Sequence, residues 1–385
     1  MTRVFFVINN LEVGGIQKSL VELLKIIVPR YDVSIYCPNL AGQYVSEIPK
    51  SVKIIDGGGF AKVAELSLGE LKKESIWYYL LRVVFVQWSR WFGRKIPAYI
   101  YSKLIKLPKE QYDWAISYSH PLESHQFAIL TNEIVLHAVE ARHKATFIHC
   151  DYKNYGGNST YNRNLFCSFD RIAAVSESVR RCFVEVLPEL GKKTVVVQNA
   201  CDFESISRLA KIDSIHYSKT CLVSVSRLSA EKGLSRCLPI IERLRDEGFV
   251  FEWHIVGDGP EKNKMKSFVE EHNLKDVVFF EGQQNNPYRF MCHANYLFLP
   301  SYHEAAPMVF NEANVLGLGV LATETLSAKE LVEERKMGVV CENSVSGIYN
   351  MLHDTLKKGV IPPSTIIDKG YNEIVASQFE KMVNV

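Results

Sequence analysis

Two basic residues bracket a turn in the C-terminal half of the chain and could hold a diphosphate. Arg227 and Lys232 lie in the segment 224–233, between the apolar run Leu222–Ser226 and a helical pattern that begins near Gly233. A helix N-terminus exposes backbone N–H groups, and two nearby cations add charge to them. The pattern predicts phosphate binding, although two solvated charges on a surface loop would look the same.

Two glutamates further along the chain could bind the sugar and ribose parts of a nucleotide sugar. Glu304 falls in a loop after the apolar run Tyr296–Leu299, and Glu312 falls about two turns away from it, inside the helix that follows. A carboxylate can accept hydrogen bonds from both hydroxyls of a ribose, and a helix N-terminus between the glutamates favours a phosphate. The apolar neighbours Val309 and Leu316 weaken the alternative of a merely solvated Glu312.

Strand-like and helix-like segments that could position these residues alternate along the whole chain. The strand-like segments are Val4–Ile8, Val33–Tyr36, Trp114–Ser117, Ala145–Ile148, Ile172–Val175, Val195–Val197, Leu222–Ser226, Phe251–Val256, Val277–Phe280, Tyr296–Leu299 and Val320–Ala322. Such alternation predicts an α/β protein with two doubly wound, Rossmann-like domains facing a cleft. Ligands of such sheets bind at the carboxyl ends of the strands.

The predicted domain boundary is a polar, weakly periodic stretch over residues 204–219, which we expect to be an interdomain linker. It separates an N-terminal domain over residues 1–203 from a C-terminal domain over residues 220–366. Residues 367–385 are expected to form a helix that packs back toward the N-terminal domain.

Composition excludes several other classes of protein. The net charge is +2, which gives no reason to expect nucleic acid as a partner. Nine cysteines occur without any C-x-x-C spacing, which argues against a zinc site and a disulfide framework. The apolar run near the first residue is too short for a signal peptide, and no stretch is long enough for a membrane span. We therefore expect a cytoplasmic protein with no metal and no cofactor.

Several motifs between about residues 220 and 345 resemble, in order, those of retaining GT-B glycosyltransferases, notably glycosyltransferase family four (group one). A glutamate, seven residues, then a second glutamate followed by alanine is the family signature. The remaining motifs are Ser226-Arg227-Leu228, Glu231-Lys232-Gly233, Ile255-Val256-Gly257-Asp258-Gly259-Pro260, Phe280-Glu281-Gly282 and Lys329-Glu330-Leu331-Val332. Gly319 replaces a common proline and Leu326-Ser327 replaces a common glycine pair, which weakens inference about the sugar but not about the class.

The resemblance implies a nucleotide-sugar site in the C-terminal domain and an acceptor site in the N-terminal domain. Arg227 and Lys232 would bind the donor diphosphate and stabilise the charge that builds on it. Glu312 would bind the ribose hydroxyls, and Glu304 would contact the donor sugar near the reacting carbon. Further donor contacts are implied for Gly15, Gly257, Gly282, Met308 and Val309.

In the N-terminal half the resemblance is looser. Gly14-Gly15 matches the family's glycine-rich loop after the first strand. His149 follows the strand Ala145–Ile148 at the position where the family places a histidine beside the donor sugar. An imidazole there could donate or accept a proton near pH 7, so we count His149 with Glu304 among the catalytic candidates. A loop histidine without such a role is the alternative.

These features predict a metal-independent transfer of a sugar, with retained configuration, from a nucleotide diphosphate sugar to a hydroxyl of a glycan. UDP is the nucleotide favoured by family base rates, and the setting would be bacterial surface polysaccharide synthesis, such as capsule or lipopolysaccharide. The alternatives are a nucleotide-sugar epimerase or a phosphorylase of the same fold, a non-catalytic glycan- or nucleotide-binding module, and a nicotinamide dehydrogenase. This chain has no G-x-G-x-x-G loop after either candidate strand, which argues against the dehydrogenase.

Residues 72–109 stand apart in composition. Nine basic residues against one acid give this stretch a net charge of +8, and it holds three of the five tryptophans. Basic and aromatic residues together suit the surface of an anionic membrane. We therefore expect peripheral contact with the inner face of the cytoplasmic membrane and a polyprenyl-linked glycan acceptor. A packed helix pair with a solvated basic face is the alternative.

Overall fold

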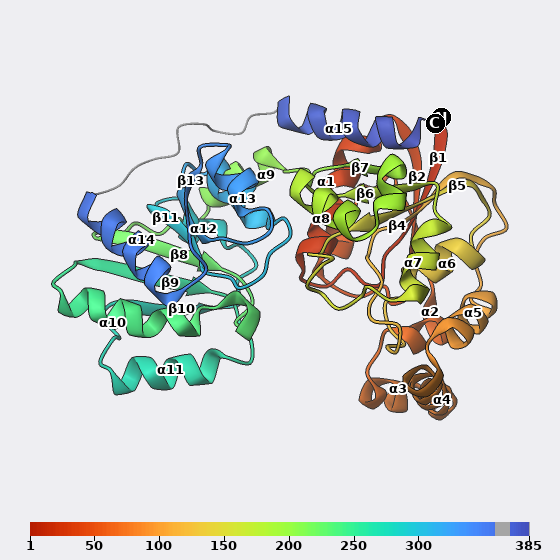
Figure 1. Ribbon diagram of the computed structural model, residues 1–385, viewed down its shortest axis with the longest axis horizontal. Coiled ribbons are helices and arrows are strands. Elements are labelled where there is room, and N and C mark those ends of the chain that lie inside the picture. The colour runs from red at the N-terminus through yellow and green to blue at the C-terminus, as the bar shows by residue number, and fades with distance from the viewer. Residues whose placement is uncertain (359–369, 385) are drawn as a thin grey trace. The chain divides into compact units, whose positions relative to one another are not determined.

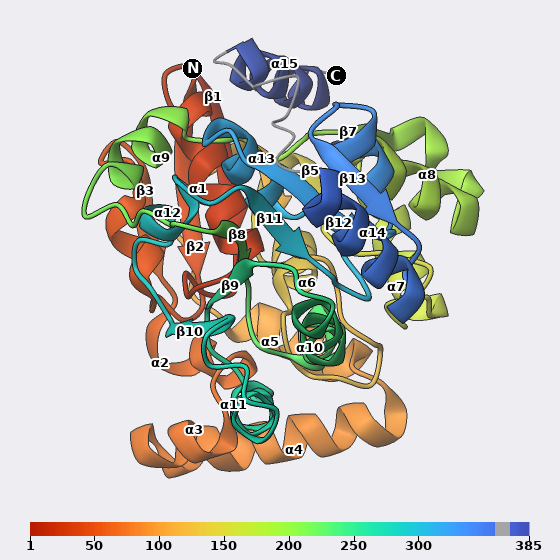
Figure 2. The same cartoon turned by 90° about the vertical axis from the view of Figure 1, so that its left-hand side faces the viewer.

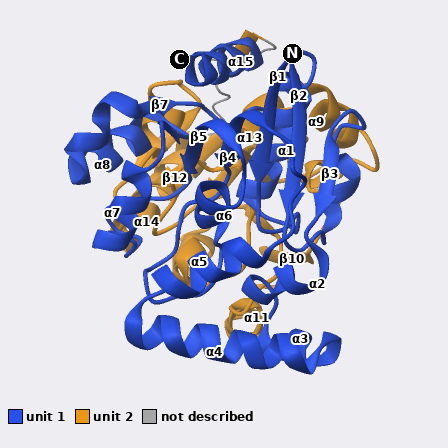
Figure 3. Ribbon diagram, turned by 90° about the vertical axis from the view of Figure 1, so that its right-hand side faces the viewer, with its two compact units in different colours: residues 1–200, 372–385 blue, residues 201–371 orange. Residues whose placement is uncertain are grey.

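The computed structural model describes residues 1–358 and 370–384, which form two compact units. Unit 1 comprises residues 1–200 and 372–385, and unit 2 comprises residues 201–371 (Figure 3). The end of the predicted C-terminal domain and the start of the predicted C-terminal helix, residues 359–369, lie outside the described residues, as does Val385.

Unit 1 is built on a parallel sheet with the order β3-β2-β1-β4-β5-β6-β7. Figure 1 labels these strands except β3. Its strands are β1 (Thr2–Val7), β2 (Tyr31–Cys37), β3 (Lys53–Asp56), β4 (Tyr112–Ser117), β5 (Ala141–Ile148), β6 (Arg171–Ala174) and β7 (Thr194–Val196). Its helices are α1 (Gly15–Ile27), α2 (Gly58–Ala61), α3 (Leu68–Glu74), α4 (Ile76–Phe92), α5 (Lys95–Leu104), α6 (Thr131–His137), α7 (Thr160–Cys167), α8 (Glu177–Val186) and α15 (Gly370–Val383).

Helices cover both faces of this sheet. On one face, Phe5 and Tyr112 share a core with Phe85 of α4 and Tyr101 of α5. On the other face, Phe379 of α15 stacks on Phe6, with the ring centroids 6.2 Å apart. Trp114 Nε1 donates a hydrogen bond of 2.9 Å to the carbonyl of Val383. Thus the last described helix is held on the N-terminal unit by aromatic packing and by a buried indole.

Unit 2 repeats the plan with the order β10-β9-β8-β11-β12-β13, and all its strand pairs are parallel. Its strands are β8 (Thr220–Val225), β9 (Phe251–Val256), β10 (Val278–Gly282), β11 (Tyr296–Leu299), β12 (Gly319–Thr323) and β13 (Gly338–Cys341). Its helices are α9 (Phe203–Ala210), α10 (Leu238–Asp246), α11 (Lys262–Glu271), α12 (Tyr288–Met291), α13 (Met308–Val315) and α14 (Val345–Lys358).

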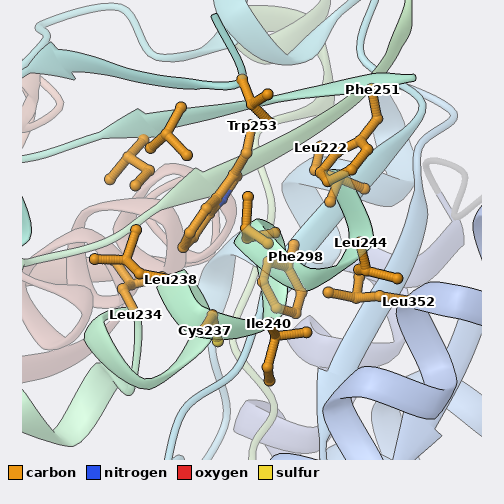
Figure 4. Close-up of a cluster of buried hydrophobic side chains, with 14 of the residues drawn as sticks. Leu222, Leu234, Cys237, Leu238, Ile240, Leu244, Phe251, Trp253, Phe298 and Leu352 are labelled. Carbon is orange, nitrogen blue, oxygen red and sulfur yellow. The ribbon is translucent and has the colours of Figure 1, made fainter. Parts of the chain in front are cut away.

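The core of unit 2 has one layer on each face of the sheet. In the layer shown in Figure 4, Trp253 and Phe298 pack against Leu238 and Leu244 of α10 and Leu352 of α14. The indole of Trp253 donates to Ser224 Oγ at 2.9 Å, so its buried N–H is satisfied. Residues of α9, α12 and α13 form the other layer. The predicted α/β class with two doubly wound, Rossmann-like domains is confirmed by these two sheets.

Two features differ from the sequence expectation. The segment 204–219, expected as a linker, begins inside α9, which Asp202 caps through a 3.0 Å bond from the Ser205 N–H. Ile206 and Ala210 of that helix are buried in the unit 2 core because they lie on one helical face. The second difference is the presence of two strands, β3 and β13, that no apolar run predicted. Within the part of the chain that is described, no helix is both long and apolar enough to cross a membrane.

Candidate functional site

The strand order of unit 2 reverses direction between β8 and β11, which are neighbours in the sheet. At such a point the loops that leave two adjacent strands diverge to opposite faces and open a crevice where ligands bind. The loop after β8 carries Arg227 and Lys232, and the loop after β11 carries Glu304. Three of the predicted donor residues therefore leave the sheet at its binding edge.

Lys232 and Glu304 are in direct contact across this point. The Lys232 Nζ donates to Glu304 Oε1 at 2.6 Å, and the two side chains are only 18% and 12% exposed. Ser301 Oγ also donates to Glu304 Oε1, at 2.8 Å. A carboxylate oxygen with two donors is fixed in direction, so Glu304 is held in place before any ligand arrives.

Backbone bonds tie the two loops together. The Tyr302 N–H donates to the Glu231 carbonyl at 2.8 Å, which joins the Glu304 loop to the Lys232 loop. Arg236 Nη2 donates to the Pro300 carbonyl at 2.8 Å. Gly233 has φ +66°, and a Cβ there would lie 2.2 Å from the Pro300 carbonyl oxygen. The close approach of the loops therefore requires glycine after Lys232.

Arg227 does not join the Lys232–Glu304 contact. Its side chain is 73% exposed and pairs with Glu231 at 3.2 Å, four residues along the same loop. An exposed ion pair of two long side chains is weak, so the guanidinium can turn toward an anionic ligand at little cost.

The glycine turn after β9 packs against the backbone of the Arg227 loop. Gly257 has φ +145°, and a Cβ there would lie 1.9 Å from the Ser226 carbonyl oxygen. The Gly257 N–H donates to the Gly282 carbonyl at 2.8 Å. Gly282 has φ +70° with no heavy atom within 4 Å of an added Cβ. Gly257 is thus required by backbone packing, whereas Gly282 leaves open space beside the turn.

Helix α13 begins directly after the Glu304 loop. Met308 and Val309 are its first two residues, and the first turn contains no acidic residue. Its N-cap residue is Pro307, which makes no side-chain cap hydrogen bond. Glu312 lies on this helix and is only 5% exposed. The helix therefore offers the N-terminal dipole and N–H groups that a phosphate needs, with a buried carboxylate one turn further along.

His149 and Gly15 belong to unit 1, whereas the other candidates belong to unit 2. His149 follows β5 and packs on Tyr118, with the ring centroids 4.9 Å apart. Gly15 is the first residue of α1, and nothing lies within 4 Å of a Cβ built there. His149 is thus at the carboxyl end of its strand, and Gly15 begins the helix that follows β1, both as expected for a ligand-binding edge.

Burial changes the chemistry expected of His149. It lowers the pKa of the imidazole to about 3, with a further lowering from nearby His120 and an opposing effect of the hydrogen bond that the imidazole donates to the backbone of Tyr118. Its Nε2 is buried and has no hydrogen-bond partner among the described residues. The side chain is therefore neutral at pH 7 and suited to hydrogen bonding rather than to the proton exchange near pH 7 that the sequence suggested.

Two polar side chains that the sequence did not single out also matter. Ser301 positions Glu304, and its only signal in the sequence was its place just after a strand. Glu65 of unit 1 is partly buried, and desolvation raises the pKa of its carboxyl to about 7, while a hydrogen bond from Asn9 and the charge of Arg82 oppose this. A carboxyl tuned to this range beside the loop after β1 can hold or release a proton at neutral pH. Nothing in the spacing of Glu65 could reveal its burial.

Comparison with known proteins identifies the region that carries this site. Residues 209–359 match the family model of glycosyl transferases group 1. This region is similar in sequence to the group 1 glycosyltransferases. The resemblance predicted from the glutamate and basic motifs is therefore confirmed.

Curated relatives of this glycosyltransferase region align with part of the chain. One, from Campylobacter jejuni, is named N-acetylgalactosamine-N,N'-diacetylbacillosaminyl-diphospho-undecaprenol 4-alpha-N-acetylgalactosaminyltransferase. It is 28% identical over 169 residues, 42% of this chain and 45% of its own. The amylovoran biosynthesis glycosyltransferase AmsK of Erwinia amylovora is 30% identical over 134 residues, 33% of each chain. The chain spans about two fifths of the length of the first curated relatives it matches, 41% and 40%.

Solved structures extend the similarity of fold over both units. A variant of TarM from S. aureus, in complex with Fondaparinux, alpha-GlcNAc-glycerol and UDP, has a TM-score of 0.68 at 13% identity and covers 100% of both chains. Anabaena Alr3699/HepE in complex with UDP and glucose has a TM-score of 0.62 at 17% identity, covering 100% of this chain and 95% of its own. At these identities the likeness concerns the fold, which is that of GT-B glycosyltransferases.

Proposed function

We propose that the protein transfers a sugar, with retained anomeric configuration, from a nucleotide diphosphate sugar to a hydroxyl of a glycan. The observation that carries this is the 2.6 Å contact between Lys232 and Glu304 at the reversal point of a group 1 glycosyltransferase domain. A fixed cation and a fixed carboxylate meet there at the edge of the sheet where ligands bind.

Charge neutralisation is the main catalytic contribution in this proposal. When the bond from the anomeric carbon to the diphosphate breaks, its electron pair stays on the phosphate oxygen. Lys232, a reoriented Arg227 and the N–H groups at Met308 and Val309 would stabilise that charge, so the transfer needs no metal. Glu304 would contact the donor sugar near the reacting carbon and Glu312 would bind the ribose hydroxyls, while Gly257 and Gly282 would shape the turns around the nucleotide. His149 and Gly15 would contribute from unit 1.

UDP is the proposed nucleotide. The TarM and HepE complexes both contain UDP, which supports this choice. The proposed setting is bacterial surface polysaccharide synthesis, supported by the amylovoran relative and by a lipopolysaccharide galactosyltransferase among the structures of similar fold.

A polyprenyl-linked glycan is the proposed acceptor, and an anionic membrane surface is the proposed place of action. The Campylobacter relative is named for an undecaprenol-linked acceptor. Helix α4 lies along an edge of unit 1 (Figure 2). At its ends Trp77, Trp91 and Phe92 are 75%, 75% and 81% exposed, beside the basic residues of the stretch 72–109. Exposed aromatic rings and cations together favour the headgroup region of a bilayer.

A cavity beside this helix could receive the anionic lipid part of the acceptor. It has a volume of about 980 Å³ within unit 1. Its lining combines the apolar residues Phe92 and Ile96 with the cations Lys95 and Lys144, and includes no carboxylate. Arg94 also lines it, but its side chain is fully buried and pairs with Glu133 at 3.0 Å. Apolar walls with a few convergent cations suit an amphiphile that carries phosphate.

Release of UDP from a panel of UDP-sugars, with and without a polyprenyl-diphosphate-linked acceptor, tests the function. We expect acceptor-dependent release, retention of configuration in the product, and loss of turnover in Glu304→Gln. Lys264→Ala, at an exposed position in the same unit, serves as the control. Turnover of a nucleotide sugar without acceptor would instead favour an epimerase, and binding without turnover would favour a non-catalytic module.

A further inference from the structure

A second group of reactive side chains lies in unit 2, away from the donor residues. The Sγ of Cys221, a carboxylate oxygen of Glu252 and a ring nitrogen of His254 all lie within 4.8 Å of one another. Cys221 pairs with Glu252 in the parallel register of β8 and β9, and His254 follows two residues later on the same face. The register of two neighbouring strands therefore brings a thiol, a carboxylate and an imidazole together.

The cluster is buried and its polar atoms are incompletely satisfied. Cys221 is fully buried, His254 is 8% exposed, and the side chain of Glu252 is 13% exposed. Within the described residues, His254 Nε2 and Glu252 Oε1 have no hydrogen-bond partner. Nε2 lies 3.8 Å from Glu252 Oε2, which is too long for a hydrogen bond but is close to the separation of two ligands around one metal ion. Buried polar atoms without hydrogen-bond partners are rare in folded proteins, and a bound ion would explain them here.

The other nitrogen of His254 is held by a second carboxylate. Nδ1 lies 2.7 Å from Oε1 of Glu281, on the neighbouring strand β10. A histidine that binds a metal through one nitrogen commonly donates its other N–H to a carboxylate, which fixes the tautomer and the ring direction. Tyr217 packs on the same imidazole, with ring centroids 4.7 Å apart, and donates its hydroxyl to the carbonyl of Phe290. The ring of His254 is therefore held with Nδ1 bound to Glu281 and Nε2 on the side of Glu252.

We propose that Cys221, Glu252 and His254 bind one divalent metal ion of the zinc class, with Glu281 orienting the imidazole. Sulfur, nitrogen and oxygen ligands together suit a borderline ion such as Zn²⁺, and three protein ligands leave a fourth position for water. The ion would join β8 to β9 directly and to β10 through Glu281. Burial raises the pKa of the Cys221 thiol, so the metal–sulfur bond forms as the thiol proton is released to solvent.

This site is separate from the proposed donor site. Cys221 and Glu252 are the second residues of their strands, near the amino ends, whereas Lys232 and Glu304 follow the carboxyl ends. Glu281 adjoins Gly282 of the proposed donor site, so the metal proposal is tested by metal binding and not by turnover. Failure to bind metal would therefore not bear on the proposed sugar transfer. The spacing rules for cysteine motifs miss the site because its ligands come from paired strands.

Zinc titration of the chelator-treated full chain tests the proposal. Competition with a chromophoric chelator should show about one Zn²⁺ per chain in the wild type and none in Cys221→Ser or His254→Gln. Glu281→Gln should bind about 10–100-fold more weakly. Cys237→Ser, at another buried cysteine of unit 2, is the matched control and should bind like the wild type.

Spectroscopy of the wild type keeps the test decisive if a variant fails to fold. Co²⁺ in place of Zn²⁺ should produce a thiolate-to-metal charge-transfer band, and Zn²⁺ should raise the unfolding midpoint by mass action. Wild-type protein that takes up no metal, lacks that band, or binds Zn²⁺ no better than Cys221→Ser would overturn the proposal.

Discussion

Replacement of Lys232 by alanine is the sharpest test of the donor site. The ammonium group is 18% exposed and bonds to Glu304 at 2.6 Å, so it is a fixed charge rather than a mobile surface one. In the proposed reaction it faces the diphosphate as negative charge develops there. Its removal should therefore reduce kcat more than it weakens donor binding.

The expected magnitude follows from this geometry. Loss of one preorganised donor to a developing oxyanion typically reduces kcat by about 10²–10³-fold, or about 2.7–4 kcal/mol. The structural cost should be smaller, because the lost hydrogen bond between charged groups contributes about 1.5–3 kcal/mol to stability. A domain stable by about 5–15 kcal/mol survives that loss, so the variant should fold and bind donor while turning over slowly. Lys232→Arg should be faster than Lys232→Ala but slower than the wild type, because the guanidinium keeps the positive charge but differs in shape from the ammonium group.

The assay is UDP release at saturating donor and acceptor, with urea unfolding run on the same preparations. Lys264→Ala, on the exposed face of α11, controls for the loss of a lysine. If Lys232→Ala keeps kcat within about threefold of the wild type while remaining folded, the charge-neutralisation argument is refuted.

Three further predictions concern other parts of the molecule. Gly257→Ala should lower the free energy of unfolding in urea by about 1–3 kcal/mol, because φ is +145° and the new Cβ would meet a carbonyl oxygen at 1.9 Å. Trp91→Ser combined with Phe92→Ser should weaken binding to anionic vesicles severalfold in sedimentation assays, and added salt should weaken wild-type binding. The unfolding midpoint should fall as pH drops from about 6.5 toward 3. The reason is that His149 stays neutral in the folded state, where its pKa is about 3, whereas the same histidine binds a proton in the unfolded chain. His149→Gln should therefore reduce the loss of stability at low pH.

Each of these predictions has a control and a refuting outcome. Gly69→Ala, where an added Cβ has open space, should leave stability nearly unchanged, and equal effects at both glycines would contradict the packing argument. Val250→Ser removes an apolar side chain that is 70% exposed in unit 2, so an equal loss of vesicle binding there would remove the case for α4. For the pH effect the comparison is His125→Gln at an exposed position, and the burial argument is wrong if both variants share one pH profile.

Much of the fold was readable because the interior strands are largely apolar. Val4–Ile8 and Tyr296–Leu299 are apolar runs, and Phe251–Val256 is apolar except for Glu252 and His254. Each run overlaps a strand of the structure. Edge strands β3 and β13 escaped notice because they pair on one side only and are half-exposed, so Lys53–Asp56 is largely solvent-facing. α9 was missed because its apolar residues are too few to stand out from a polar stretch.

The sequence by itself determined the class of the protein, since the glutamate pair, the basic turn and the glycine turns are local patterns with fixed spacing. Only the tertiary structure decided which of those residues touch. Lys232 meets Glu304 across 72 positions because the strand order reverses between β8 and β11, whereas Arg227 turns to Glu231 in its own loop. Burial set the pKa of His149 and of Glu65, and strand register assembled the Cys221 cluster. Contact across a sheet and exclusion of water depend on the whole fold, so no local spacing could encode them.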